Sequence, residues 1–312
     1  MNKMSRKLMF SILTLTFALL TLGTATFAWF TLTDTATISQ FDATVMAGEG
    51  IEVSLGEDNP NFFTAVPSEV INAFLQGAGF AGDFRMKHIT SADGINFKDL
   101  NGDPKTNPKQ DGYIEFTLRF RSQQSGINIY LAPGSGLSGA AVDWIADTTF
   151  NNGRGTEVEP QDGSKLYYIA NAARFSTTST LGTLVYELPD KAYGTTTNAD
   201  YGNTVLGTQP ILNGSVHYYN QKRGLSSDPS NYTGIDYEGA KTAPSVTTFF
   251  DQDPILKLST TAQSDGYYYG TVVVRIWIEG WDADCFDALY GASLKIDLQF
   301  TATQPTAPVQ PE

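Results

Sequence analysis

The sequence predicts an all-β protein: an antiparallel β-sandwich, jelly-roll-like, with short helices and one long loop-rich insertion. Three observations favour this class. Strand-forming residues are common, with 15 tyrosines and 19 phenylalanines among 312 residues. Several segments alternate apolar and polar residues with the period of two that a half-buried strand shows. Turn motifs rich in Gly and Asn separate these segments, as in all-β architectures.

The clearest strand covers residues 113–121, where an apolar residue occupies every second position. These apolar residues are Ile114, Phe116, Leu118 and Phe120. Charged residues and threonine lie between them. One face of the strand should therefore pack on the core, and the other should be exposed to solvent. Residues 127–131 are expected to pair with this strand. The other predicted strands are 37–45, 51–55, 166–175, 183–188, 267–279 and 293–301.

The remaining segments complete a single domain over residues 29–303. Residues 67–76 predict a short helix, with Ser68 as its N-cap and Gly77 at its end. Residues 190–248 are polar and rich in tyrosine, and they predict an elaborated insertion rather than a second domain. The tail, residues 304–312, holds three prolines and no core residues, which predicts disorder.

The N-terminus predicts a signal peptide over residues 1–28. A positively charged start precedes an apolar run, and small residues follow it. Cleavage is expected between Ala28 and Trp29, with the bond between Ala25 and Thr26 as the alternative. The apolar run is marginal in length for a bilayer, so a retained membrane anchor is the second interpretation. Either way, most of the chain should lie outside the cytoplasm.

Charge and composition exclude several function classes. Lys and Arg number 20 against 33 Asp and Glu, a net charge of -13, so nucleic acid is not an expected partner. The single cysteine, Cys285, allows no intramolecular disulfide. The two histidines, His88 and His217, lie far apart and outside any His-Glu-x-x-His motif. We therefore expect no enzymatic activity.

Two short motifs mark the ends of the chain. The first comprises Ala28, Trp29, Phe30, Asp34 and the step Ala47-Gly48, and the second is Phe-x-Ala-Thr-Gln over Phe300 to Gln304. Both motifs resemble the TasA and camelysin family of Gram-positive exported proteins. The resemblance covers only these two ends of the chain.

That resemblance implies a jelly-roll protein on the surface of a Gram-positive-type bacterium or in its extracellular matrix, as in biofilms. Members build matrix fibres, and some donate an N-terminal strand to a neighbouring copy. The candidate donor residues here are Trp29, Phe30, Ile38 and Phe41. Expected partners are copies of this chain or other matrix and surface components, with membrane contact only through the N-terminal segment. Pairing of that strand inside its own sandwich is the alternative.

Two other functions stay open at this stage. A surface adhesin or carbohydrate-binding module is favoured by tyrosines accompanied by Asn, Gly and Ser, a composition typical of adaptable binding surfaces. These tyrosines are Tyr167, Tyr168, Tyr186, Tyr193, Tyr201, Tyr218, Tyr219, Tyr232 and Tyr237. A camelysin-like metallopeptidase is the third reading, which the resemblance implies.

No cofactor is expected except calcium, for which two acidic stretches are candidates. The ligands would be Asp99, Asn101 and Asp103 in the first stretch and Asp282, Asp284 and Asp287 in the second. The first copies part of an Asp-x-Asn-x-Asp loop, although Asn-Gly-Asp-Pro is also ordinary turn chemistry. The second could equally form a helical turn with Asp284 as its N-cap.

Overall fold

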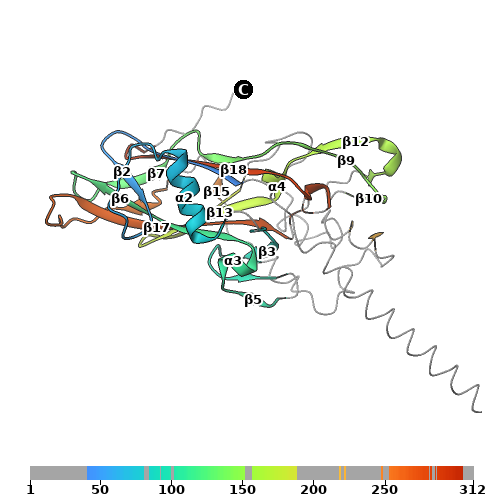
Figure 1. The fold of residues 1–312 in the computed structure, drawn as a ribbon, viewed down its shortest axis with the longest axis horizontal. Coiled ribbons are helices and arrows are strands. Elements are labelled where there is room, and N and C mark those ends of the chain that lie inside the picture. The colour runs from blue at the N-terminus through green and yellow to red at the C-terminus, as the bar shows by residue number, and fades with distance from the viewer. Residues whose placement is uncertain are drawn as a thin grey trace, which may run out of the picture. The chain divides into compact units, whose positions relative to one another are not determined.

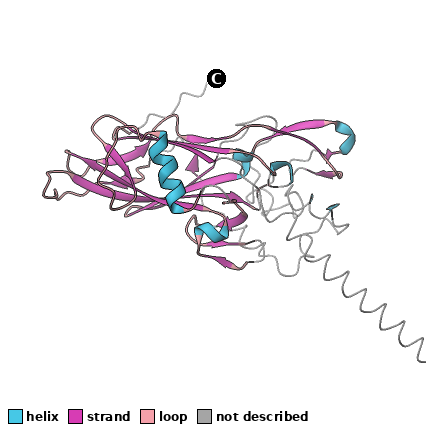
Figure 2. Cartoon of the chain, viewed as in Figure 1, coloured by secondary structure: helices cyan, strands magenta, loops and turns pink. Residues whose placement is uncertain are grey.

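The computed structural model describes residues 41–80, 84–91, 93–99, 102–151, 157–187, 218, 221–222, 247–248, 253–280, 282, 285 and 287–304. Strands dominate these residues, as Figure 2 shows, and most of them belong to two large sheets. The predicted all-β, antiparallel-rich sandwich is therefore confirmed.

The larger sheet has nine strands built around β17 (Tyr268–Glu279). One edge of β17 pairs with β13 and the other with β6, both antiparallel, while β3 joins its last two residues in parallel. β2 pairs with β6, and β14 lies between β13 and β15. These strands are β2 (Glu52–Leu55), β3 (His88–Ser91), β4 (Phe97–Lys98), β5 (Pro104–Lys105), β6 (Ile114–Ser122), β13 (Ala173–Ser179), β14 (Gly182–Glu187) and β15 (Thr247–Thr248).

The second sheet has five strands around β18 (Leu294–Thr301). They include β1 (Phe41–Ala47), β7 (Asn128–Leu131), β8 (Gly136–Ser138) and β16 (Leu256–Lys257). β1 pairs with β18 in parallel, whereas β7 and β8 pair with it antiparallel. The expected pairing of residues 127–131 with 113–121 is wrong, since β7 pairs with β18 and β16. The turn between β6 and β7, where Gly126 has a φ of 63°, carries the chain from one sheet to the other.

The core lies between the inner faces of the two sheets. The alternation predicted for β6 and β18 is confirmed, because every second residue of each strand is buried. The rings of Phe120 and Phe300 meet edge to face with centroids 4.8 Å apart and join the two layers. A Cβ added to Gly270 would lie 3.0 Å from Leu256, so a side chain at this position of β17 would crowd β16.

The predicted helix forms as α2 (Ser68–Ala78), but both of its predicted caps are wrong. Pro67 is the N-cap, and Ser68 is the first helical residue. Gly77 lies inside the helix, which ends because Gly79 adopts a left-handed conformation with a φ of 82°. The helix packs its apolar face on the sandwich, where the ring of Phe74 meets that of Phe116.

Smaller elements complete the described chain. The predicted strand 166–175 is in fact divided into β12 (Ser164–Tyr167), α4 (Ile169–Ala172) and the start of β13. The others are α3 (Pro108–Asp111), β9 (Val142–Ile145), β10 (Phe150–Asn151), β11 (Glu157–Val158), η1 (Pro160–Asp162) and η3 (Asp287–Leu289). β9 pairs with β12 and β10 with β11 as two-stranded sheets.

Several predicted segments lie outside the described residues. They include the signal peptide, most of the insertion at 190–248, and residues 305–312 of the tail. From the insertion, the structure describes residues 218, 221–222 and 247–248. Within the part of the chain that is described, no helix is both long and apolar enough to cross a bilayer.

Candidate functional site

β1 occupies an edge of the five-stranded sheet. All seven of its residues pair with β18, from Phe41 opposite Leu294 to Ala47 opposite Phe300. Over its last three residues the far side of β1 also bonds to residues 64–66: Ala47 N–H donates to Thr64 O at 2.7 Å, and Val45 O accepts from Val66 N–H at 2.9 Å. The backbone ladder to β18 is therefore the main attachment of this strand.

The side chains of residues 43–47 in β1 differ in burial. Across residues 43–47, Val45 is deeply buried at 1% exposure, whereas Met46 is 42% exposed. The chain then runs very close to β18, because a Cβ on Gly48 would lie 2.9 Å from the carbonyl oxygen of Phe300. Of the four candidate donor residues, Phe41 is the first residue of β1. Trp29, Phe30 and Ile38 lie outside the described residues, as do both candidate cleavage sites.

The outer face of the nine-stranded sheet is covered at one end by a flap, which we define as residues 88–113. Figure 1 shows its elements β3, α3 and β5 on the side of β17 that faces away from β18. Trp277 is fully buried beneath the flap, and its ring meets that of Phe97 at 5.2 Å. Phe97 also stacks on Tyr113, and burial raises the pKa of the Tyr113 hydroxyl to about 12. The flap thus builds a second, small core on the outer face.

A buried ion network lies beside this second core. Arg174 Nη1 is 3.4 Å from Glu279 Oε2, and Arg174 Nη2 is 3.7 Å from Asp282 Oδ2. The indole N–H of Trp277 donates to Glu279 Oε2 at 3.1 Å. All three charged side chains are at most 1% exposed. The network fastens the chain that follows β17 to β13, so the calcium candidate Asp282 has an arginine as its partner.

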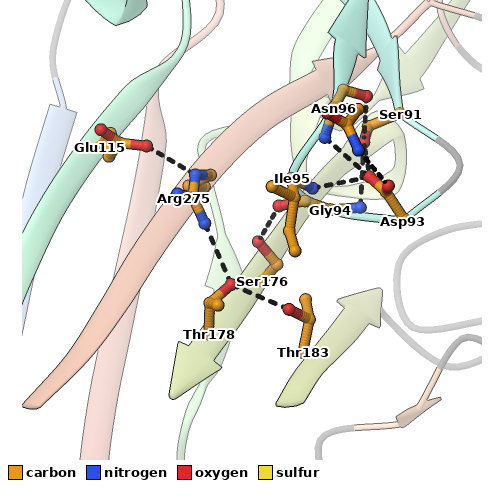
Figure 3. A network of polar contacts seen from close by, with 10 residues as sticks. All are labelled: Ser91, Asp93, Gly94, Ile95, Asn96, Glu115, Ser176, Thr178, Thr183 and Arg275. Carbon is orange, nitrogen blue, oxygen red and sulfur yellow. Dashed lines mark hydrogen bonds and ion pairs between the residues drawn. The ribbon is translucent and has the colours of Figure 1, made fainter. Parts of the chain in front are cut away.

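The tip of the flap binds β13 through the contacts drawn in Figure 3. Ser176 Oγ donates to the carbonyl oxygen of Gly94 at 2.7 Å. Asp93 Oδ1 organises the turn by accepting from the N–H groups of Ile95 at 2.9 Å and Asn96 at 2.7 Å. Burial raises the pKa of the Asp93 carboxyl, but these hydrogen bonds outweigh it and the pKa is lowered. We call this hydrogen-bonded tip of the flap the clasp.

A salt bridge on the neighbouring strands completes the network in Figure 3. Arg275 Nε donates to Glu115 Oε2 at 2.6 Å, and Arg275 Nη1 donates to Thr178 Oγ1 at 3.0 Å. These contacts tie β6, β17 and β13 together across the outer face. They pair the polar side chains of three neighbouring strands.

The other end of the outer face carries an arginine–aromatic surface, comprising Phe62, Arg119, Arg121, Tyr267 and Tyr269. Arg119 lies 4.2 Å from the ring centre of Tyr269, and Arg121 lies 4.2 Å from that of Phe62 and 4.3 Å from that of Tyr267. Arg121 also pairs with Glu52 at 2.6 Å. This cluster was not predicted from the sequence. Its signal was two arginines at alternate positions of the wet face of β6.

The first calcium candidate forms the turn of the β4–β5 hairpin. Asp99 Oδ1 accepts from the N–H of Asp103 at 3.0 Å, and Asp99 Oδ2 pairs with Lys105 Nζ at 2.8 Å. Asn101 lies outside the described residues. The carboxylate of Asp99 thus contacts the backbone of Asp103 and the side chain of Lys105.

The second calcium candidate is divided between two places. Asp282 contacts Arg174, whereas Asp287 Oδ2 lies within hydrogen-bond distance of the hydroxyl oxygen of Tyr218, at 3.0 Å. Asp284 lies outside the described residues. Within the described ranges, no three His, Cys, Asp or Glu side chains gather as a metal site would require.

The described tyrosines of the adhesin hypothesis take packing positions. Tyr186 stacks on Phe175 with ring centres 4.6 Å apart, and Tyr167 and Tyr218 are buried. Tyr168 is half-buried, and the other five tyrosines lie outside the described residues. Cys285 is half-buried against the core, His88 begins β3, and His217 is not described.

Comparisons with protein-family models, with curated proteins and with solved structures found no match for this chain. A functional assignment therefore depends on the fold, the strand edges and the surface contacts described above. The edge strand β1 presents backbone groups, and the arginine–aromatic surface presents half-exposed charged and aromatic side chains.

Proposed function

We propose that this chain is an exported structural subunit of a bacterial cell surface or extracellular matrix, which assembles by giving its N-terminal strand to a neighbouring copy. The position of β1 carries this proposal. It is the first described strand, it lies at a sheet edge, and a parallel backbone ladder to β18 attaches it. The N-terminal chain therefore enters the fold where another copy could replace it without moving any other strand.

Physical arguments support exchange of this strand. A strand from a second copy would offer β18 the same backbone donors and acceptors, so the ladder would be rebuilt between subunits. Exchange must also remake the two backbone bonds to residues 64–66 and rebury Val45, and a strand of the same sequence from a second copy supplies the same groups. Trp29, Phe30 and Ile38 would accompany β1 and add apolar contacts between subunits. The predicted signal peptide would present this segment outside the cell once it is cleaved.

A deletion tests the role of the segment before β1. We expect the mature chain, beginning at Trp29, to form fibres visible by electron microscopy. A variant lacking residues 29–40 keeps β1 and should fold with the same circular dichroism spectrum, but it should stay monomeric. Fibres of the deleted chain equal to those of the mature chain would exclude a donated segment.

A reversible lock tests the exchange of β1 itself. Thr44 and Asp297 face each other across the β1–β18 ladder. We therefore expect a Thr44→Cys, Asp297→Cys variant in a Cys285→Ser background to close a disulfide within one chain. The oxidised protein should stay monomeric, and reduction should restore assembly. The control is the Cys285→Ser protein, whose assembly should not depend on reductant. Assembly of the oxidised, locked monomer would show that β1 is not exchanged.

A surface adhesin is the second candidate, and the arginine–aromatic surface favours it. Tyrosine and arginine are enriched where proteins bind partners, and aromatic rings beside polar groups suit glycans. A glycan array tests this function. We expect binding that a Tyr269→Ala, Arg119→Ala variant loses and that an Asp143→Asn variant, changed on the distant strand β9, retains. Equal binding by both variants would remove this surface as the binding site.

A further inference from the structure

Tyr218 attaches part of the long insertion to the sandwich. Its side chain is 4% exposed, and its ring meets those of Phe150 at 5.1 Å and Trp144 at 5.8 Å. Trp144 belongs to β9 and also packs on Tyr167 of β12. These rings form a socket for Tyr218, which we name the aromatic socket. Tyr218 is therefore docked against the paired strands β9 and β12.

The hydroxyl of Tyr218 lies between two carboxylates. It is 3.0 Å from Asp147 Oδ1 and 3.0 Å from Asp287 Oδ2. Asp147 follows β9 and also pairs with Lys222 Nζ, so the insertion contributes a cation as well as a hydroxyl. Asp287 begins η3 and holds no lysine or arginine partner among the described residues.

A count of protons shows what this geometry requires. A phenol has one O–H, and an ionised carboxylate can only accept hydrogen bonds. If both carboxylates were ionised, one of the two 3.0 Å contacts would join two acceptors without a proton between them. A proton on one carboxyl removes the conflict, because the acid then donates to the phenol oxygen. Asp147 pairs with Lys222 Nζ whereas Asp287 has no such ion pair among the described residues, which assigns the proton to Asp287.

We propose that Asp287 is protonated when the insertion is docked, so that docking of the insertion on the aromatic socket is favoured by acid and weakened as the pH rises. The acid O–H of Asp287 donates to the phenol oxygen of Tyr218. The phenol O–H of Tyr218 donates to Asp147, whose other oxygen pairs with Lys222. Loss of the proton from Asp287 breaks the first bond of this chain.

The electrostatic surroundings agree with this assignment. Burial is the largest influence on Asp287 and raises its pKa, Asp147 raises it further, and the contacts with Tyr218 and Lys222 lower it in part. The pKa of Tyr218 is also raised, chiefly by burial, so its hydroxyl keeps its proton. Of the neighbouring charges on the hairpin, Asp143 is exposed and Lys165 pairs with Asp162 at 2.8 Å.

The sign of the pH effect follows from the raised pKa. An acid whose pKa is higher in the docked state takes up a proton on docking. The protonated acid contributes fully to the free energy of docking below the ordinary aspartate pKa. This contribution is lost as the pH rises through the pKa of the docked state. Each unit by which the pKa is raised corresponds to about a tenfold change in the docking equilibrium.

Two measurements on the mature full-length chain test the proposal. The first is an NMR titration of the Asp287 carboxyl carbon, which should titrate above the ordinary aspartate pKa of about 3.9. The second is hydrogen exchange of the peptide that spans residues 218–222 from about pH 4 to about pH 8, normalised for intrinsic exchange. Protection of this peptide should fall by about tenfold for each unit of the raised pKa.

Three variants complete the test. In Asp287→Asn the amide can donate as the acid does, so protection should stay high and lose its pH dependence. Tyr218→Phe removes the shared hydroxyl and should lower protection at acid pH. Asp143→Asn, on the exposed face of β9, is the matched control and should follow the wild-type profile. Titration of Asp287 at or below the ordinary value, or a wild-type pH profile in Asp287→Asn, would overturn the proposal. Neither result bears on strand exchange, so the two proposals fail separately.

Discussion

The outer face of the nine-stranded sheet has two ends that differ in what covers them. Along β17, alternate residues from Tyr269 to Glu279 point to this face. At one end Tyr269 is half-exposed beside two arginines, whereas at the other end Trp277 and Glu279 are fully buried. The difference comes from the flap, which lies over the second end only. Whether the outward face of a strand is exposed to solvent therefore depends on which other segments of the chain cover it.

The covered end also stabilises charges that the open end leaves to solvent. Glu279 receives hydrogen bonds from Trp277 and from the backbone of Ser91, and it pairs with Arg174. Arg121 pairs with Glu52 at a half-exposed position. Because buried charges depend on their partners far more than exposed ones do, equivalent substitutions should have unequal effects at the two ends.

The largest difference should come from removing one ring at each end. We expect Trp277→Ala to lower the free energy of unfolding by about 3–5 kcal/mol, because it empties the second core beneath the flap. Tyr269→Ala, eight residues earlier on the same strand, removes a cation–π contact. Apart from that contact, it should lower the free energy of unfolding by less than about 1 kcal/mol. Urea unfolding followed by circular dichroism measures both. Equal losses would mean that the flap does not seal the covered end.

Removing one arginine at each end should give the next largest difference. Arg174→Met leaves Glu279 and Asp282 buried without their cation, which should cost about 3–5 kcal/mol of unfolding free energy. Arg121→Met removes a half-exposed pair and should change it by less than about 1 kcal/mol. The same unfolding experiment compares them, and the idea that the network fastens β17 to β13 fails if the Arg174 variant is as stable as the Arg121 variant.

A pair of glycines isolates the contact between the flap and the sheet. Gly94 and Gly266 both have positive φ, 72° and 83°, so alanine is strained at each. A Cβ at Gly94 would also lie 2.7 Å from Ser176 and Val185, whereas one at Gly266 would meet nothing within 4 Å. Gly266→Ala should therefore cost about 1 kcal/mol and Gly94→Ala about 2–3 kcal/mol. Similar melting temperatures for the two variants would show that the clasp adjusts freely.

The elements that could be predicted from sequence are those with a local periodicity. The alternation in β6 and β18 identified both strands and their buried residues correctly, because the period of two depends only on neighbouring residues. The partners of the strands could not be found in this way. β7 follows β6 in the chain and pairs with β18, because the turn at Gly126 leads to the other sheet.

The candidate sites were harder to predict for the same reason. Asp282 and Asp287 are near in sequence, but one contacts Arg174 of β13 and the other contacts Tyr218 of the insertion. Local spacing cannot show such distant partners. The helix caps at Pro67 and Gly79 were missed by one or two residues, which is the usual uncertainty at a helix end.

The smallest expected effect is a pH dependence that again distinguishes the two ends. Asp93 at the covered end and Asp265 at the open end both have a lowered pKa. At Asp93, burial raises the pKa but the hydrogen bonds of the turn outweigh this effect. At Asp265, the pKa is lowered chiefly because the hydroxyl of Tyr269 donates a hydrogen bond to the carboxylate. A lowered carboxyl pKa contributes stability above the ordinary aspartate value, and this contribution is lost as the pH falls through the folded-state pKa. The melting temperature should therefore fall on acidification, and Asp93→Asn should reduce this acid dependence. Asp265→Asn should reduce it less, because water screens an exposed carboxylate. Melting temperatures between about pH 2 and about pH 5 measure the two slopes. If Asp265→Asn reduces the acid dependence of the melting temperature more than Asp93→Asn does, the acid-sensitive contact lies at the open end and not in the clasp of the flap.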